Sequence, residues 1–111
     1  MTLKELISNP DSIKELVKPM GYCIVSCKIT DEELPVGYMY REAPFEDEDC
    51  GWRFLSGTED EEYLDIDENN KLVDVNVVAN LDPAIIPHLY KKKGTELERD
   101  FESNTFVELK D

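Results

Sequence analysis

Residues 36–56 read VGYMYREAPFEDEDCGWRFLS, and they combine two strand-like segments with an acidic connection. Successive side chains of a strand point to opposite faces, so the valine and both tyrosines of residues 36–42 share one face. The tryptophan and the phenylalanine of residues 51–56 share a face in the same way. The connection between them, residues 43–50, is longer than a tight hairpin turn. This stretch therefore predicts two strands joined by an acidic loop.

The flanking segments predict more strands and several short helices. Alternation or valine content indicates strands in three further segments, residues 22–29, 71–79 and 105–109. Side chains that can cap free backbone N–H groups indicate helices that begin at residues 2–5, 12–15, 58–61 and 82–83.

The order of these elements favours the α+β class. Strands in the middle and helices towards both ends predict a mostly antiparallel sheet of about four to five strands, with helices packed on one face. A chain of 111 residues has room for one hydrophobic core, so residues 1–111 are predicted to form a single domain.

Negative charge is the most informative bulk property of the chain. The formal net charge is −14, from 26 acidic and 12 basic residues. Residues 42–68 contain twelve of the acids and a single base, Arg53, so most of the excess lies there. Such a field repels nucleic acid and anionic membranes, and it attracts cationic surfaces. The plainer interpretation is that the acids only keep the protein soluble.

Membrane and secretion signals are missing from the pattern. No apolar run approaches the roughly 20 residues that a membrane helix needs, and the N-terminus does not resemble a signal peptide. Cys23 and Cys27 would lie about 13 Å apart in a strand, too far for a disulfide, so we expect buried and inert thiols. These features predict a cytoplasmic protein.

Residues that often catalyse reactions or bind metals form no convincing site. Residues 65–76 begin like a calcium-binding EF-hand loop, but asparagine stands at the turn position and again at the twelfth position. His88 is the only histidine, which excludes a multi-histidine metal site, and we expect it to be partly buried. The sequence therefore predicts no enzyme activity and no cofactor.

Two sets of residues are candidates for contact with another molecule. Aromatic residues and arginines dominate binding hot spots, because they bury a large area and keep a polar group. The first candidate is an outward-facing, partner-binding set: Phe45, Glu46, Asp47, Glu48, Asp49, Glu59, Asp60, Glu61 and Glu62. The second candidate is a pocket formed by Tyr40, Arg41, Trp52 and Arg53. The alternative places Trp52 and Phe54 in the core and pairs both arginines with nearby carboxylates.

Two sequence blocks also stand out together: YMYREAP at residues 38–44, and DCGWRFLSG at residues 49–57 followed by Glu59, Asp60 and Tyr63. They resemble the core pattern of the bacterial immunity protein 33-like family, and the resemblance runs from about residue 22 to residue 101. Cys50 stands where that pattern leads us to expect a serine. The resemblance implies an α+β fold and, as for some members, a role as antidote to a toxin encoded by a neighbouring gene.

Two functional hypotheses follow from the charge and the resemblance. In the first, the protein is a non-catalytic inhibitor whose acidic surface binds a basic toxin. In the second, it is a stand-alone ligand-binding or housekeeping module, and its acids only keep it soluble. The sequence does not indicate an oligomeric state.

Overall fold

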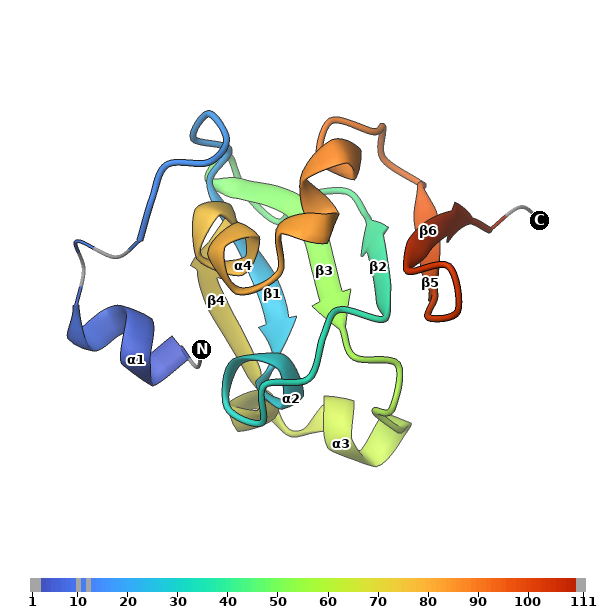
Figure 1. The fold of residues 1–111 in the computed structure, drawn as a ribbon, viewed down its shortest axis with the longest axis horizontal. Coiled ribbons are helices and arrows are strands. Elements are labelled where there is room, and N and C mark those ends of the chain that lie inside the picture. Colours follow the sequence, from blue (N-terminus) through green and yellow to red (C-terminus); the bar gives the residue numbers. More distant parts are fainter. Residues whose placement is uncertain (1–2, 10, 12, 110–111) are drawn as a thin grey trace.

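The computed structural model describes residues 3–9, 11 and 13–109, which form one six-stranded sheet with short helices (Figure 1). The strands are β1 (Tyr22–Ser26), β2 (Tyr38–Arg41), β3 (Asp49–Leu55), β4 (Asn70–Asp74), β5 (Glu96–Asp100) and β6 (Thr105–Glu108). Their order across the sheet is β4-β1-β3-β2-β5-β6, and every neighbouring pair is antiparallel except β1 and β3. The α+β class and the mostly antiparallel sheet are therefore confirmed, with slightly more strands than expected.

Helical segments are short, and two of them cover one face of the sheet. They are α1 (Leu3–Ser8), α2 (Cys27–Thr30), α3 (Glu61–Asp65), α4 (Val75–Leu81) and the 3-10 helices η2 (Asp67–Asn69) and η3 (Pro83–His88). Figure 1 shows α4 and η3 in front of the sheet, where they cover one of its faces. Within the described residues, no helix combines the length and the apolar character that crossing a membrane requires.

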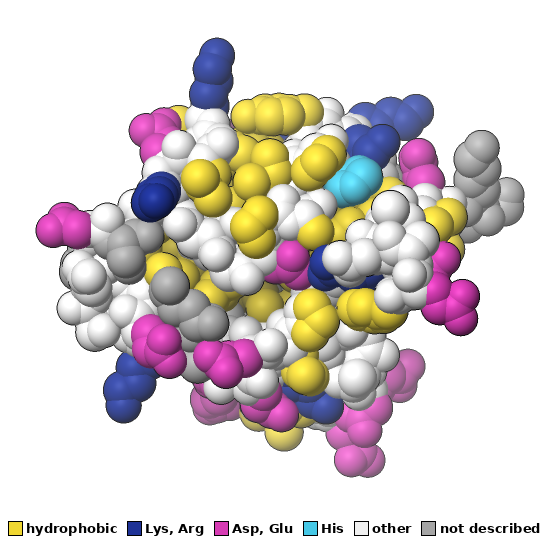
Figure 2. Space-filling view, in the orientation of Figure 1, with side chains coloured by type: hydrophobic (Ala, Val, Ile, Leu, Met, Phe, Trp, Pro, Cys, Tyr) yellow, Lys and Arg dark blue, Asp and Glu magenta, His cyan; other side chains and the backbone are white. Residues whose placement is uncertain are grey.

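The hydrophobic core fills the space between the sheet and these two helices. Trp52 and Phe54 of β3 are fully buried there, as the alternative interpretation of the sequence placed them, and their rings stack 6.1 Å apart. Trp52 also donates a hydrogen bond from Nε1 to the carbonyl oxygen of Leu89 at 2.9 Å, so its polar group is satisfied in the interior. Figure 2 views the molecule from this helical side and shows Asp and Glu side chains gathered along the lower edge, beside α3.

The helix predicted to begin at residues 12–15 does not form among the described residues of that segment. The reason is the side chain of Asn76, which lies in α4. Its Oδ1 accepts hydrogen bonds from the N–H groups of Leu16 (2.8 Å) and Val17 (3.0 Å), and its Nδ2 donates to the Val17 carbonyl (3.0 Å). Asn76 thus takes up backbone groups that a local helix would have used.

Two predicted strands end earlier than expected, because a capping residue starts a helix inside each of them. The valine-rich segment 71–79 divides at Asp74, whose carboxylate accepts from the Asn76 N–H and begins α4. In the same way Ser26 ends β1 and caps α2. Buried apolar runs do not distinguish strand from helix, since both bury them equally well. β5 was not predicted, because Leu97 is the only apolar residue in it.

We expect Asn76→Ala to lower the free energy of unfolding by about 2–3 kcal/mol, because buried backbone groups of residues 16 and 17 lose their partners. Urea denaturation measures this change. Asn80→Ala is the matched control: Asn80 also bonds the N-terminal segment, through Lys14, but at exposed positions. A loss for Asn76→Ala no larger than the loss for Asn80→Ala would contradict the assignment.

Candidate functional site

The face of the sheet opposite α4 and η3 is uncovered over most of its length, and we call it the open face. Alternation and strand register place on it Tyr22, Ile24, Tyr38, Tyr40, Arg53, Leu55, Leu72, Asp74, Glu96, Glu98 and Val107. Several of these side chains are half-buried or exposed, and Leu72 is 62 % exposed. Among the described helices, α3 reaches one end of this face, where Leu64 lines a hollow with Tyr40 and Leu55. Over most of this face, the described residues thus leave an aromatic and acidic surface accessible to solvent.

Arg53 lies at the centre of the open face, yet only 3 % of it is exposed. It forms ion pairs with Glu42 and Asp49, and the ring of Phe45 lies 5.0 Å from its guanidinium carbon. Burial alone would lower the pKa of Arg53, but hydrogen bonds and charges from Asp49 and Glu42 raise it above the ordinary value. The positive charge of Arg53 is therefore balanced by two carboxylates of the same chain, as the alternative interpretation predicted for this arginine.

Asp49 was predicted to be an exposed partner-binding acid, and this prediction is wrong. Its side chain is fully buried and accepts four hydrogen bonds. Oδ2 accepts from the Phe45 N–H (2.9 Å) and from Arg53 Nη2 (2.8 Å), while Oδ1 accepts from the Gly51 N–H (2.8 Å) and from Arg53 Nη1 (2.9 Å). The hydrogen bonds from Arg53, joined by those two N–H groups, hold the pKa of Asp49 well below its usual range despite burial. Asp49 therefore organises the loop instead of facing outward.

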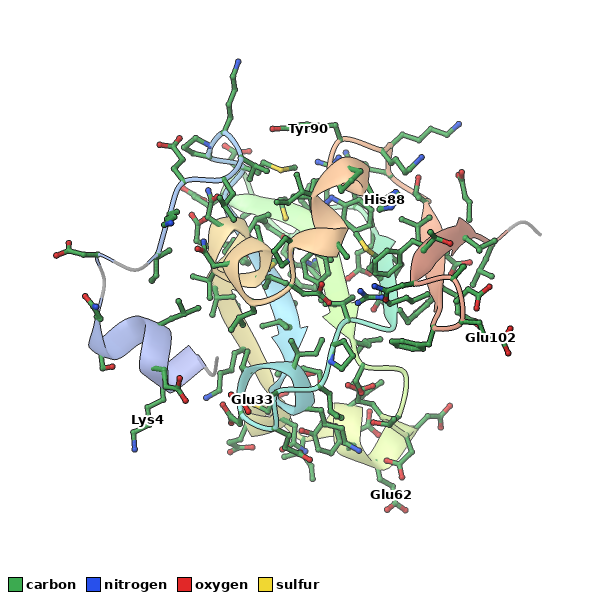
Figure 3. All side chains as sticks on the ribbon, viewed as in Figure 1. Lys4, Glu33, Glu62, His88, Tyr90 and Glu102 are labelled. Atoms are coloured by element: carbon green, nitrogen blue, oxygen red, sulfur yellow. The ribbon has the colours of Figure 1, made fainter. Side chains whose placement is uncertain are left out.

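The other predicted partner-binding residues are divided between the two ends of β3, so they do not form one cluster. Phe45, Glu46, Asp47 and Glu48 precede β3 and are exposed; Phe45 is 72 % exposed. Residues 59–62 follow β3. The length of this seven-residue strand, about 20 Å, therefore separates them from residues 45–48. Figure 3 shows Glu62 pointing away from the molecule beside α3. Sequence proximity suggested a single patch because the strand between the two segments is short in sequence.

Two of the acids after β3 have structural tasks. Glu59 accepts hydrogen bonds from the N–H and the hydroxyl of Ser56 and from the Gly57 N–H, each at 2.9 Å, and so braces the turn. Asp60 caps α3 by accepting from the Tyr63 N–H at 2.8 Å, within the segment 58–61 where a helix was predicted to begin. Glu61 and Glu62 are exposed on α3.

The predicted pocket of Tyr40, Arg41, Trp52 and Arg53 does not exist as one site. Tyr40 is paired with Arg53 in the register of β2 and β3, while Arg41 is paired with Trp52. Because adjacent residues of a strand point to opposite faces, the first pair lies on the open face and the second on the covered face. Arg41 there donates hydrogen bonds to the carbonyl groups of Cys50 (3.0 Å) and Lys91 (2.8 Å).

Tyrosines and glutamates of the open face were not all identified from the sequence. The Tyr38 hydroxyl donates to Glu96 at 3.1 Å, and the Tyr22 hydroxyl donates to Glu46 at 2.9 Å. Desolvation, together with these carboxylates, raises the pKa of each tyrosine to about 12, so both remain neutral donors. Glu96 and Glu98 were missed because β5 was missed. The alternation of charged residues with Leu97 was the one feature of the sequence that could have indicated this strand.

The thiols and the histidine are packed in the interior or half-buried. Cys23, Cys27 and Cys50 are free and buried, and burial raises the pKa of all three thiols, as expected for unreactive cysteines. The His88 ring is half-buried, as predicted, and lies 5.4 Å from the Phe106 ring. Within the described part of the chain, no group of three or more His, Cys, Asp or Glu residues is arranged to hold a metal ion.

We expect Asp49→Asn to lower the free energy of unfolding by about 3 kcal/mol near neutral pH, because Arg53 loses part of its buried counter-charge. The pKa of Asp49 is depressed in the folded state, so its contribution is complete above the unfolded value of about 3.9 and is lost as the pH falls towards the folded value. Urea denaturation at several pH values should therefore show the gap to the original chain closing in acid. Asp47→Asn, at an exposed position, should change stability little; a pH-independent gap for Asp49→Asn would contradict the role of its ionised form.

The comparison with known proteins identifies the family. Residues 23–110 match the family described as Immunity protein Imm33 domain, close to the range over which the two sequence blocks suggested a resemblance. No curated protein and no solved structure matches the chain. Because the family match covers most of the sequence, the chain belongs to the Imm33 immunity protein family.

Proposed function

We propose that this protein is an immunity protein that neutralises a toxin by binding a cationic surface of the toxin with its open face. The observation that carries this proposal is the composition of that face. It combines tyrosines and aliphatic side chains with Asp74, Glu96 and Glu98, and the one cation among the described residues assigned to it, Arg53, is buried and paired. At the described residues of this face, a partner would therefore meet negative charge and aromatic area without a competing exposed cation.

The two acidic segments support the proposal, because each adjoins one end of the open face. At one end, Glu46 accepts the hydrogen bond of Tyr22, and Phe45 lies over Arg53. At the other end, Glu59 lines a groove together with Tyr38. Apart from Asp49, the acids expected to bind a partner thus flank one elongated surface.

Electrostatics and aromatic area would serve different purposes in such a complex. Clustered carboxylates accelerate association with a cationic protein, and this effect weakens as salt shortens the screening length to about 10 Å or less. Tyrosines contribute to lasting contact, since they bury a large apolar area and keep a hydroxyl for hydrogen bonding. A fast and durable antidote needs both properties.

A small-molecule ligand is the second candidate, and the hollow beside Tyr40, Glu42 and Arg53 favours it. Its volume is about 200 Å³, below the roughly 300–1,000 Å³ of typical ligand pockets. The guanidinium at its floor already has two carboxylate partners. Recognition of a protein is therefore better supported than a small-molecule site at this hollow.

Genetic neighbourhood provides a direct test. Each gene adjacent to the one encoding this protein is expressed in a bacterial host, alone and together with the protein. We expect one neighbour to arrest growth alone and to be tolerated when the protein is present, with the purified pair forming a complex. If no neighbour is toxic, or if a toxic neighbour is not counteracted, the immunity function is contradicted.

Charge reversal tests the surface itself. We expect Asp47→Lys combined with Glu48→Lys to slow association with that toxin about tenfold at low salt, because steering is lost, and the difference should shrink at high salt. Stopped-flow or surface-plasmon measurements give the rate. Glu15→Lys combined with Glu108→Lys changes the net charge equally but lies away from the open face. Equal slowing by both pairs would mean that net charge, and not this surface, governs association.

A further inference from the structure

A groove of about 590 Å³ lies at the end of the open face nearest α3. It is bounded by the start of β2, the turn after β3, α3 and the end of β5. These segments are far apart in the sequence and meet only because β5 pairs with β2 and the chain turns back after β3. The groove is large enough for one long side chain and parts of the residues beside it.

The walls of the groove are apolar and partly aromatic. Tyr38, Leu55, Leu64 and Phe101 line it, and Phe101 is 57 % exposed although it is a large apolar residue. The Phe101 ring lies 5.5 Å from the guanidinium of Arg99, which fixes its place at the mouth of the groove. An exposed ring held beside a hollow is a suitable surface on which a flat cation can stack.

Two carboxylates lie at this groove, and no described lysine or arginine forms an ion pair with either. Glu98 is exposed on β5. Burial alone would raise the pKa of Glu59. Hydrogen bonds from Ser26 and Ser56 have the larger effect and lower this pKa below its ordinary value, so Glu59 stays ionised. The groups that donate hydrogen bonds to Glu59, the N–H and hydroxyl of Ser56 and the N–H of Gly57, are all uncharged. The groove therefore contains negative charge that the described residues leave uncompensated.

Arg99 also touches the groove, but its charge is already balanced. It is buried, pairs with Asp82 at 2.7 Å, and donates to Asn104 (3.0 Å) and to the Val36 carbonyl (3.1 Å). It therefore anchors the β5–β6 hairpin and does not repel a cation at the exposed mouth.

We propose that this groove receives an arginine side chain of the toxin, with its stem between Tyr38, Leu55 and Phe101 and its guanidinium at Glu98 and Glu59. The assignment of this arginine to a toxin rests on the proposed function. The ability of the groove to bind an arginine side chain does not depend on that function. A guanidinium is planar, so it can stack on the Phe101 ring and donate two parallel hydrogen bonds to a carboxylate. In the complex, the groove then holds one arginine of the toxin, while the other exposed acids accelerate association by attracting the cationic surface of the toxin.

The test uses the purified full-length protein and two short probes, N-acetyl-Gly-Arg-Gly-amide and the same peptide with citrulline in place of arginine. Citrulline keeps the shape of arginine and removes its charge. Binding is followed by NMR chemical shifts of ¹⁵N-labelled protein at millimolar peptide. We expect the arginine peptide to shift the amide signals of residues 56–59 and 98–101 and the citrulline peptide to leave them unchanged.

Variants separate the two parts of the recognition. Glu98→Gln should weaken binding of the arginine peptide about tenfold by removing a charged partner, and Phe101→Ala should weaken it several-fold by removing the stacking surface. The matched controls are Glu15→Gln, an exposed acid away from the open face, and Tyr90→Ala. Tyr90 is 65 % exposed and lies at the opposite end of the molecule from Glu62 (Figure 3). Neither control should change binding.

The results of the titration and of the gene-neighbour test distinguish failure of the groove proposal from failure of the immunity function. No shift with the arginine peptide, equal binding of both peptides, or equal effects of variants and controls would overturn the groove as an arginine site. Since no toxin enters this titration, such a result leaves the immunity function to its own test. Conversely, peptide binding at the groove with no toxic neighbour would support the groove and contradict the immunity function.

Discussion

The buried ion pair between Asp49 and Arg53 is the interaction on which the rest of the structure depends. Arg53 occupies the central strand and would face the open side of the sheet as an isolated cation if Asp49 and Glu42 did not enclose it. Asp49 satisfies Arg53 with both oxygens and simultaneously accepts from the backbone at Phe45 and Gly51. One carboxylate thus determines the start of β3, the path of the acidic loop and the electrical neutrality of the face above it. The removal of a partner from such a pair is costly because the remaining charge stays away from water.

The same network explains why the sequence blocks that resemble the immunity protein family consist largely of structural residues. Gly51 has φ = +88°, and a Cβ there would lie 2.4 Å from the Glu42 carbonyl oxygen, so the turn into β3 requires glycine. Arg41 and Trp52 both donate hydrogen bonds to the carbonyl of Leu89, and Arg41 also donates to the carbonyl of Lys91. Glu59 accepts a hydrogen bond from the Ser56 N–H and so stabilises the turn after β3. These residues build the scaffold. Of the residues in these blocks, Tyr38 and Tyr40 of β2 and Arg53 and Leu55 of β3 also lie on the open face, which gives that face a base on two central strands.

Several features could be predicted from the sequence because they depend on local pattern. The alternation around Trp52 identified the central strand, and residues 58–61 and 82–83 were recognised as segments where helices begin. The valine-rich segment could not be divided correctly, since Val75, Val77 and Val78 are buried in a helix as they would be in a strand. Glu96 and Glu98 of the candidate surface were missed with β5, whose short, charged sequence lacks a hydrophobic pattern.

The sequence by itself determined the class of fold, the excess of negative charge in residues 42–68 and the absence of a multi-histidine metal site. Only the tertiary structure decided which of these acids are exposed and which are buried. Asp49 and Glu46 are three residues apart, yet one is buried against Arg53 and the other is exposed beside Tyr22. The groove at the end of the open face likewise combines residues 38, 55, 59, 98 and 101, which no local pattern connects. The physical reason is that formal charge is a property of composition, whereas exposure and pairing are set by contacts between strands distant in the chain.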